Sequence, residues 1–182
     1  METHRLRSAE SKILTREQMA AEAARLRGEG RALVFSNGCF DLMHAGHVTY
    51  LEFARAQGDA LVVGLNSDAS VKTNKGDKRP VVAQEHRARV LAALECVDYV
   101  VRFDEKEPRA LIEQLTPAVL VKGADWAHYV SGREWVEAHG GRVVLAPLVE
   151  GLSTTNVIGR ILEVYGNGGA PAPQTTSGGT KA

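Results

Sequence analysis

Five short runs of mostly apolar residues alternate with segments of helical spacing along the chain. The runs stand at residues 33–35, 60–65, 97–101, 119–121 and 143–145. Nearly continuous apolar runs are typical of strands that are buried on both faces of a parallel sheet. Helical patterns follow the runs at 48–57, 84–94, 108–115, 133–139 and 153–165. The alternation predicts an α/β fold with a Rossmann-like, doubly wound, five-stranded parallel sheet.

Both ends of the chain depart from this alternation. Residues 15–26 combine a capping-box pattern with apolar positions at helical spacing, which predicts one helix outside the main pattern. We therefore divide the chain into an N-terminal extension with one helix (1–30), a domain (31–165) and a tail (166–182). The tail has no apolar period, and its composition predicts disorder.

Charge and cysteine content narrow the possible classes. The chain has 22 basic and 22 acidic residues, so no basic surplus suggests a nucleic-acid partner. No apolar run approaches the roughly 18 residues of a membrane span, and no apolar signal core follows the N-terminus. Cys39 and Cys96 do not form a disulfide framework. We expect a cytoplasmic protein that binds neither nucleic acid nor membrane.

Most candidate functional residues are concentrated in the stretch after the first apolar run. A glycine turn leads into His-x-Gly-His, where His44 and His47 are three residues apart at the start of a helical pattern. Unpartnered amides and the helix dipole favour an anion there, and both imidazoles face the same side of the first turn. The stretch predicts a phosphate site whose further contacts come from Asn37, Gly38, Cys39, Phe40 and Asp41.

Two other interpretations of the histidine pair remain open. The pair could be merely structural, or it could hold a metal ion. A metal site needs more ligands at suitable spacing, and the other histidines (4, 86, 128 and 139) are scattered. We therefore predict no metal bound by protein side chains. Cys39 lies in the turn, but no histidine–acid arrangement supports it as a nucleophile.

Polar segments also follow three later runs. Lys72 and Lys75 lie in the polar, basic segment 72–80, which is either a solvated loop or a mobile flap that brings a lysine to phosphates. Gly123 and Asp125 follow the fourth run, and the hydroxyl residues Ser153, Thr154 and Thr155 follow the fifth. Turns and helix caps explain these residues equally simply. Because parallel strands end at one edge of the sheet, we expect the segments to meet at one site.

At this point the residues match a family. Gly38-Cys39-Phe40-Asp41 followed by His44-Ala45-Gly46-His47 resembles the GxFD…HxGH signature of the cytidylyltransferase-like nucleotidyltransferases. Leu152-Ser153-Thr154-Thr155 is similar to that family's element at the start of the last helix. The resemblance covers about residues 31–163 and implies the HxGH nucleotidyltransferase fold. It also implies a lysine flap, a nucleotide contact at Gly123–Asp125, and a site arginine at Arg87.

These residues suggest a mechanism without a covalent intermediate. We expect a substrate phosphate to attack the α-phosphorus of a nucleoside triphosphate directly and in line. His44 and His47 would donate to the α-phosphate, and Lys75, with Lys72 as the second candidate, would hold other phosphates. Ser153, Thr154 and Thr155 would hold the leaving pyrophosphate. Mg²⁺ would bridge phosphate oxygens, and Asp41 would either orient the turn or touch the hydrated metal.

Within the family, the chain looks most like the heptose 1-phosphate adenylyltransferases. The similar stretches are Asn66–Lys72, Cys96–Asp98, Leu120–Gly123 and Glu150–Asn156. The resemblance implies that ATP and D-glycero-D-manno-heptose 1-phosphate give ADP-heptose for cell-surface polysaccharide. Many members are fused to a sugar kinase. This chain is too short for that, so we expect the kinase on a separate chain and this protein as a homodimer or higher homo-oligomer.

Three alternatives stay open. A glycerol 3-phosphate cytidylyltransferase also fits Gly123–Trp126 and Glu85–Arg87, although Leu148 stands where that branch usually has an arginine. A non-catalytic nucleotide-binding module would keep the fold, but the intact His-x-Gly-His disfavours it. A dinucleotide-binding dehydrogenase is disfavoured because the first turn lacks Gly-x-Gly-x-x-Gly.

Overall fold

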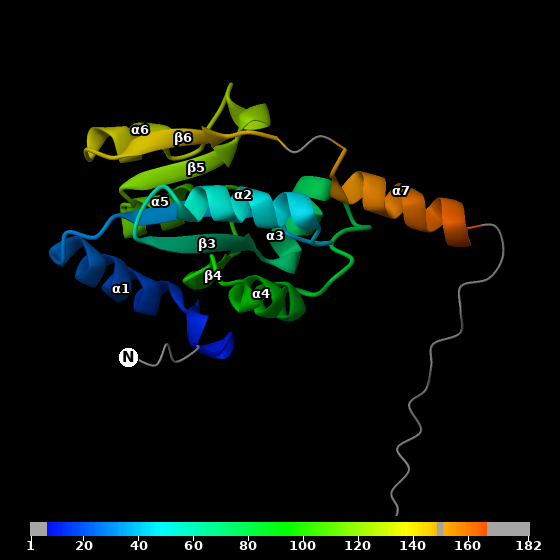
Figure 1. The fold of residues 1–182 in the computed structure, drawn as a ribbon, viewed down its shortest axis with the longest axis horizontal. Helices are drawn as coiled ribbons and strands as arrows, with labels where there is room; N and C mark the ends of the chain where they lie inside the picture. Colours follow the sequence, from blue (N-terminus) through cyan, green and yellow to red (C-terminus); the bar gives the residue numbers. More distant parts are fainter. Residues whose placement is uncertain (1–6, 149–150, 167–182) are drawn as a thin grey trace, which may run out of the picture.

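The computed structural model describes residues 7–148 and 151–166. One six-stranded sheet, with strand order β1-β4-β3-β2-β5-β6, forms its centre, and every paired neighbour is parallel. Helices cover both faces of this sheet (Figure 1). The strands are β1 (Ile13–Leu14), β2 (Leu33–Gly38), β3 (Ala60–Asn66), β4 (Tyr99–Phe103), β5 (Val119–Gly123) and β6 (Arg142–Ala146).

The α/β class and the doubly wound parallel sheet are confirmed, whereas the predicted number of strands is wrong. All five apolar runs are strands, and the sixth, β1, pairs with β4 at the edge of the sheet. β1 has only two residues, too few to give a run that the sequence pattern can reveal. It comes from the segment 1–30, so part of the expected extension belongs to the central sheet.

The sheet has two apolar faces, each with its own layer of helices. On one face pack α1 (Arg16–Gly28), α5 (Arg109–Leu115) and α6 (Arg133–Ala138). On the other pack α2 (Ala45–Arg55) and α4 (Gln84–Ala93). The expected capping box at Thr15 is present, and it starts α1, whose buried residues join the core.

The segment expected as a flexible loop begins as a helix. α3 (Asp68–Lys75) includes Lys72 and Lys75 in its last turn and is capped by the Ser67 side chain, which accepts from the Ser70 amide. Its buried residues are Ser70 and Val71, so the apolar periodicity that would mark a helix is missing. The loop prediction is wrong for residues 72–75, and the loop proper begins at Gly76, which has a φ of 89°.

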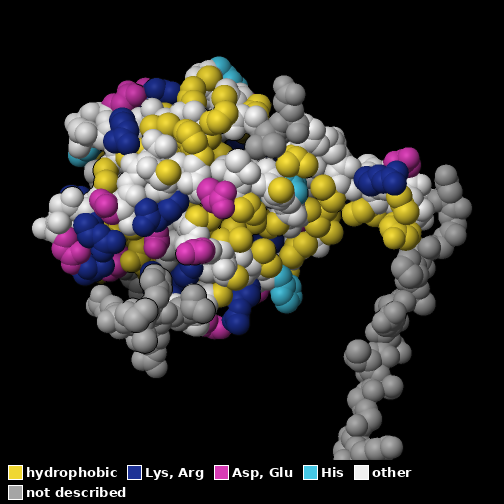
Figure 2. Space-filling view, viewed as in Figure 1, with side chains coloured by type: hydrophobic (Ala, Val, Ile, Leu, Met, Phe, Trp, Pro, Cys, Tyr) yellow, Lys and Arg dark blue, Asp and Glu magenta, His cyan; other side chains and the backbone are white. Residues whose placement is uncertain are grey.

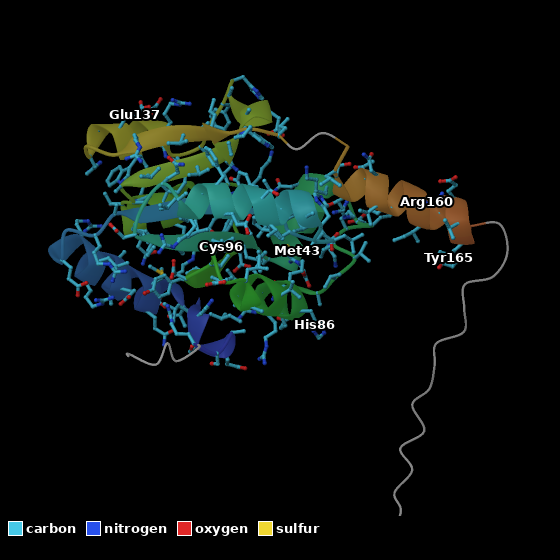
Figure 3. All side chains as sticks on the ribbon, in the orientation of Figure 1. Met43, His86, Cys96, Glu137, Arg160 and Tyr165 are labelled. Carbon is cyan, nitrogen blue, oxygen red and sulfur yellow. The ribbon has the colours of Figure 1, made fainter. Side chains whose placement is uncertain are left out.

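The last helix, α7 (Thr154–Tyr165), extends away from the body of the molecule (Figure 1). Its apolar residues have core spacing in the sequence, but none of its residues is buried. Leu162 is 62% exposed and Tyr165 is 52% exposed. Figure 2 shows hydrophobic side chains along this helix, and Figure 3 shows Arg160 and Tyr165 on its outer part, away from the sheet. This apolar face, whose spacing in the sequence is typical of a core-facing helix, therefore does not join the core of the same chain.

Two further expectations concern the C-terminal tail and membrane-spanning helices. The disordered tail was predicted for 166–182, and residues 167–182 lie outside the described part of the chain. Within the described part, none of the helices combines the length and the apolar character that crossing a membrane requires.

We predict opposite results for two leucine truncations on helices. Leu51→Ala on α2 should lower the free energy of unfolding by about 2–5 kcal/mol, because Leu51 is fully buried in the core. Leu162→Ala on α7 should change it by less than about 0.5 kcal/mol, because Leu162 faces solvent. Urea unfolding followed by circular dichroism measures both. A large loss for Leu162→Ala would show that the α7 face is covered in solution.

Candidate functional site

A cavity with two adjoining lobes lies at the carboxyl edge of the sheet. The histidine lobe, of about 330 Å³, is lined by His44, Gly46, Gly123, Asp125, Leu148 and Leu152 among others. The basic lobe, of about 510 Å³, is lined by Lys75, Arg79, Lys106, Glu107, Tyr129 and Ser131 among others. The two lobes share one wall, made of Asn37, Gly38, Cys39, Phe40, His47, Lys122, Trp126 and Thr154. Segments far apart in the sequence therefore meet at one site, as parallel topology predicts.

The two histidines stand together at the start of α2. His44 is the N-cap residue, and its ring centroid lies 3.9 Å from that of His47. Tyr50 fixes this helix against the sheet, because its hydroxyl bonds Ser36 Oγ at 2.7 Å and donates to the Val121 carbonyl at 3.1 Å. The imidazoles are thus held on a rigid helix start, with the ring of His47 on the shared wall.

The hydrogen bonding of His47 fixes which ring nitrogen donates. The His44 amide donates to His47 Nδ1 at 3.3 Å, so the proton of a neutral His47 lies on Nε2. Burial, with a smaller contribution from His44, lowers the pKa of His47 to about 4. At neutral pH, His47 is therefore an uncharged donor through Nε2. The buried Nδ1 of His44 has no hydrogen-bond partner within the described residues.

The turn after β2 forms the shared wall. Phe40 has a φ of 45°, an uncommon left-handed conformation for an aromatic residue, and its ring is 5.4 Å from that of His47. The buried Oδ1 of Asn37 lacks a hydrogen-bond partner among the described residues. Burial raises the pKa of the Cys39 thiol, which keeps it protonated at neutral pH and argues against a nucleophilic role.

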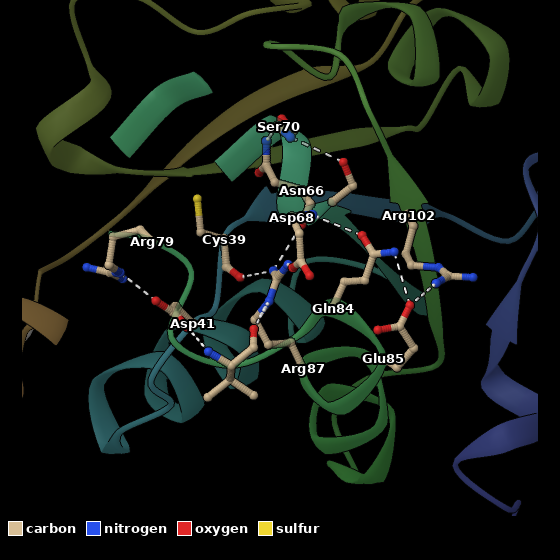
Figure 4. Close-up of polar contacts among 12 residues, drawn as sticks. Cys39, Asp41, Asn66, Asp68, Ser70, Arg79, Gln84, Glu85, Arg87 and Arg102 are labelled. Carbon is tan, nitrogen blue, oxygen red and sulfur yellow. Dashed lines mark hydrogen bonds and ion pairs between the residues drawn. The ribbon is translucent and has the colours of Figure 1, made fainter. Parts of the chain in front are cut away.

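Asp41 orients the loop that faces the cavity. Its carboxylate is buried and accepts a hydrogen bond from Arg79, which Figure 4 shows. It also accepts from the amides of Val81 and Val82. Burial opposes ionisation, but these bonds outweigh it and lower the pKa of Asp41. Of the two roles that the sequence left open for Asp41, the contacts support orientation of the backbone. They also hold Arg79 at the basic lobe.

Arg87 does not reach the cavity. Its side chain is fully buried, and its guanidinium donates to the carbonyls of Cys39, Asn66 and Val82 and to the Asp68 carboxylate (Figure 4). Its donors are directed at protein oxygens in this structure, so these contacts lend no support to a nucleotide contact at Arg87, which stays a prediction. Arg87 is a positioning residue that ties the turn after β2 to the end of β3.

The structure separates the two candidate lysines. Lys75, at the end of α3, lines the basic lobe. Lys72 lies one turn earlier on the same helix, is exposed, and is absent from the lining of both lobes. Lys75 is thus the lysine of this pair that faces the cavity.

Gly123 and Asp125 line the histidine lobe, as their place after β5 predicts. A Cβ on Gly123 would come within 2.5 Å of Asp125 Oδ1, so a larger residue there would displace the Asp125 side chain. Ser153 caps α7 by accepting from the Asn156 amide at 3.1 Å and lines the histidine lobe. Thr154 lies on the shared wall, and Thr155 lines the basic lobe.

Lys122 is a site residue that the sequence analysis missed. Lys122 stands between the apolar run at 119–121 and Gly123. A polar residue at the end of a buried strand, next to a predicted site residue, could have indicated its role. Its ammonium lies 5.3 Å from the centroid of the Trp126 ring, and burial lowers the pKa of Lys122 to about 8. Other missed residues belong to neither motif: Asn66 at the end of β3, Asn74 on α3, and Lys106, Glu107, Tyr129 and Ser131 on loops.

The cavity suits a metal that arrives with a ligand better than a resident metal. Among the described residues, no three histidine, cysteine or acidic side chains are grouped to hold an ion. The Asp41 carboxylate is occupied by protein donors. Mg²⁺ keeps several waters and binds phosphate oxygens readily, so the residues present fit Mg²⁺ that is bridged by phosphates.

We predict an unusually low titration midpoint for His47. NMR of imidazole-labelled protein should show its midpoint near pH 4, because burial disfavours the charged ring. The unfolded chain protonates His47 near pH 6.5, so stability falls as the pH drops from 6.5 towards 4. His47→Gln should reduce this pH dependence. A midpoint at or above 6.5 would contradict the burial argument.

Comparisons with known proteins agree with this geometry. The sequence profile named cytidylyltransferase-like matches residues 35–160. The bifunctional protein HldE of Geobacter sulfurreducens is 55% identical over 158 residues, which are 86% of this chain and 32% of that protein. HldE of Magnetococcus marinus is 55% identical over 141 residues, covering 77% of this chain and 29% of that protein. The chain spans about a third of the length of these curated relatives.

Solved structures share the fold at lower identity. A lipopolysaccharide core biosynthesis protein from Thermoplasma volcanium has a TM-score of 0.55 and 24% identity, covering 66% of this chain and 98% of that one. Pantothenate synthetase from Thermus thermophilus has a TM-score of 0.56 and 17% identity, covering 80% and 67%. At such identities the likeness concerns the fold. The profile match over most of the chain, together with the relatives, shows that the chain belongs to the cytidylyltransferase-like family and is a nucleotidyltransferase.

Proposed function

We propose that this nucleotidyltransferase transfers an adenylyl group from ATP to a heptose 1-phosphate, giving ADP-heptose and pyrophosphate. The main support for nucleotidyl transfer at this site is the position of His47, which lies on the wall shared by both lobes of the cavity. Two substrates that bind on either side of that wall would bring their phosphates together beside a neutral, fixed hydrogen-bond donor.

The histidine lobe suits a nucleoside. Pro147, Leu148 and Leu152 give it apolar walls, and Gly46 and Gly123 let a flat base approach the backbone. A Cβ on Gly46 would lie 3.1 Å from both the His44 ring and Leu152, so even a methyl group would narrow the lobe. The Asp125 carboxylate can accept from ribose hydroxyls in the same lobe.

Leu148 supports ATP over CTP. It lines the histidine lobe at the position where the cytidylyltransferase branch that resembles this chain usually has an arginine. A leucine side chain offers an apolar surface and no donor for the carbonyl of a cytosine. This residue therefore favours the larger, more apolar surface of adenine in that lobe.

Positioning and charge stabilisation would drive the reaction. An oxygen of the acceptor phosphate attacks the α-phosphorus, forming a new P–O bond, while the bond to the β-phosphate oxygen breaks and pyrophosphate leaves with the electron pair. No proton is removed from the acceptor, so no general base is required. His47 Nε2 would donate to the α-phosphate oxygens that gain charge, assisted by His44 and the amides of the turn.

The leaving pyrophosphate would contact Ser153, Thr154, Thr155 and Lys75. The hydroxyl residues stand at the start of α7, where backbone amides also point outward. Mg²⁺ would enter with ATP, and it supplies charge neutralisation between phosphates. The protein's own contribution is the set of fixed donors around the phosphates.

The choice of a heptose phosphate comes from the relatives. The stretches that resemble heptose 1-phosphate adenylyltransferases support it, as does the 55% identity to bifunctional HldE proteins. Those relatives are bifunctional by name and about three times as long as this chain, so they do not support a kinase on a separate chain. The cytoplasmic location and the homo-oligomer stay predictions.

We predict that His47→Ala and His44→Ala each lower kcat at least about 100-fold. One well-placed donor to the transition state contributes about 3 kcal/mol. Single-turnover measurement of pyrophosphate release tests this, and thermal melting checks that the variants fold. His86→Ala, an exposed histidine on α4, is the matched control and should keep full activity. Near-normal turnover in both site variants would show that the pair is structural.

A second prediction concerns the substrates. Each of ATP and CTP is paired in turn with D-glycero-D-manno-heptose 1-phosphate and with glycerol 3-phosphate. Of these four pairs, ATP with the heptose phosphate should release pyrophosphate fastest. If CTP with glycerol 3-phosphate reacts faster, the proposed substrates are wrong and the chain is better described as a glycerol 3-phosphate cytidylyltransferase. Absence of release from every pair, with nucleotide still bound, would favour a non-catalytic binding module.

A further inference from the structure

The part of the basic lobe farthest from the histidines has no role in the chemistry described above. Lys106, Glu107, Tyr129 and Ser131 line it, and they come from the loop after β4 and the loop that precedes α6. None of them belongs to either sequence motif. Their side chains nevertheless form a polar surface inside a cavity of about 510 Å³, a size typical of small-molecule sites.

Ser131 gives this surface an unused hydrogen-bonding group. The residue is only 7% exposed, and its Oγ has no hydrogen-bond partner among the described residues. Beside it, the Glu107 carboxylate accepts from the Tyr129 hydroxyl at 2.8 Å. This bond, with a smaller contribution from the nearby Ser131 hydroxyl, lowers the pKa of Glu107 and keeps it ionised, although Ser131 Oγ makes no hydrogen bond of good geometry with either residue. A buried hydroxyl is normally satisfied, so a ligand with hydroxyl groups would complete this site.

Lys122 marks the other end of the same lobe, on the shared wall. Its ammonium contacts the Trp126 ring and makes neither an ion pair nor a hydrogen bond with a described residue. A largely buried ammonium is costly without an anion beside it. Lys75 and Arg79 add positive charge to the same lobe.

The charged and hydroxyl groups of the basic lobe favour a phosphate monoester with hydroxyl groups over a polyphosphate. A polyphosphate that reached Glu107 would bring a second anion against an ionised carboxylate, and like charges repel, a repulsion that the neighbouring Lys106 offsets in part. A phosphate monoester with a polyol tail avoids this conflict, because its phosphate meets the cations while its hydroxyls donate to the carboxylate. The part of the lobe around Glu107, Tyr129 and Ser131 therefore matches an acceptor better than it matches pyrophosphate.

We propose that one part of the basic lobe is the acceptor site, in which Lys122 holds the phosphate and Glu107, Tyr129 and Ser131 bind the hydroxyls of the sugar, while Lys75 and Thr155 of the same lobe are left to the pyrophosphate. This inference rests on the proposed function and assigns its second substrate to particular residues. With the nucleoside in the histidine lobe, the acceptor phosphate then faces the α-phosphorus from the other side of the shared wall, as direct attack requires.

Binding measurements test the proposal without needing turnover. The protein is saturated with Mg²⁺ and α,β-methylene ATP, and inorganic phosphate, glycerol 3-phosphate, mannose 1-phosphate and the heptose 1-phosphate are titrated calorimetrically. Affinity should rise with the number of hydroxyls. Glu107→Gln and Ser131→Ala should each weaken the two sugar phosphates about tenfold and leave inorganic phosphate within about twofold. Lys122→Gln should weaken every ligand at least about tenfold.

Matched controls separate the acceptor site from general damage. Glu134→Gln, on the exposed surface of α6 and outside both lobes, should bind the whole series like the wild type. The proposal is overturned if Glu107→Gln and Ser131→Ala bind the sugar phosphates normally, if they weaken inorganic phosphate equally, or if the wild type binds none of the series. Failure of the proposed function would instead appear as absent pyrophosphate release from ATP by a wild type that shows this binding pattern.

Discussion

The cavity depends on one buried guanidinium. Arg87 lies on α4, yet its four described hydrogen bonds go to the turn after β2, the end of β3, the start of α3 and the loop before α4. Removing a charged group from water costs several kcal/mol, and only such a complete set of partners offsets that cost. The same bonds fix the backbone of Cys39, which lies on the wall between the two lobes.

Asp41 completes this framework from the cavity side. Its carboxylate receives the amides of Val81 and Val82 together with Arg79, so the loop that follows α3 is tied to the turn after β2. Arg87 and Asp41 thus act through the backbone, whereas His47, Lys75 and Lys122 face the cavity. A charged residue close to a phosphate site in sequence can therefore serve the site without touching the ligand.

The two lobes explain how one fold can hold two different substrates. The histidine lobe has apolar walls and close backbone approach, which suit a base. The basic lobe combines the cations Lys75, Arg79, Lys106 and Lys122 with a carboxylate and hydroxyls, which suit a phosphorylated polyol. Family membership accounts for nucleotidyl transfer, and the residues of the second lobe, outside the motifs, carry the proposed choice of acceptor.

The sequence by itself determined the parallel α/β sheet and the motif residues of the site, because buried strands leave nearly continuous apolar runs and parallel strands end at one edge. It did not reveal β1, which is too short, or the helical state of Lys72 and Lys75, because α3 buries little apolar surface. Only the tertiary structure decided that Arg87 binds protein oxygens, that the apolar face of α7 is exposed, and that Lys122, Glu107 and Ser131 share one lobe. The physical reason is that periodicity records which residues are buried, whereas the partner of a charged or polar side chain depends on loops that meet only after the sheet has formed.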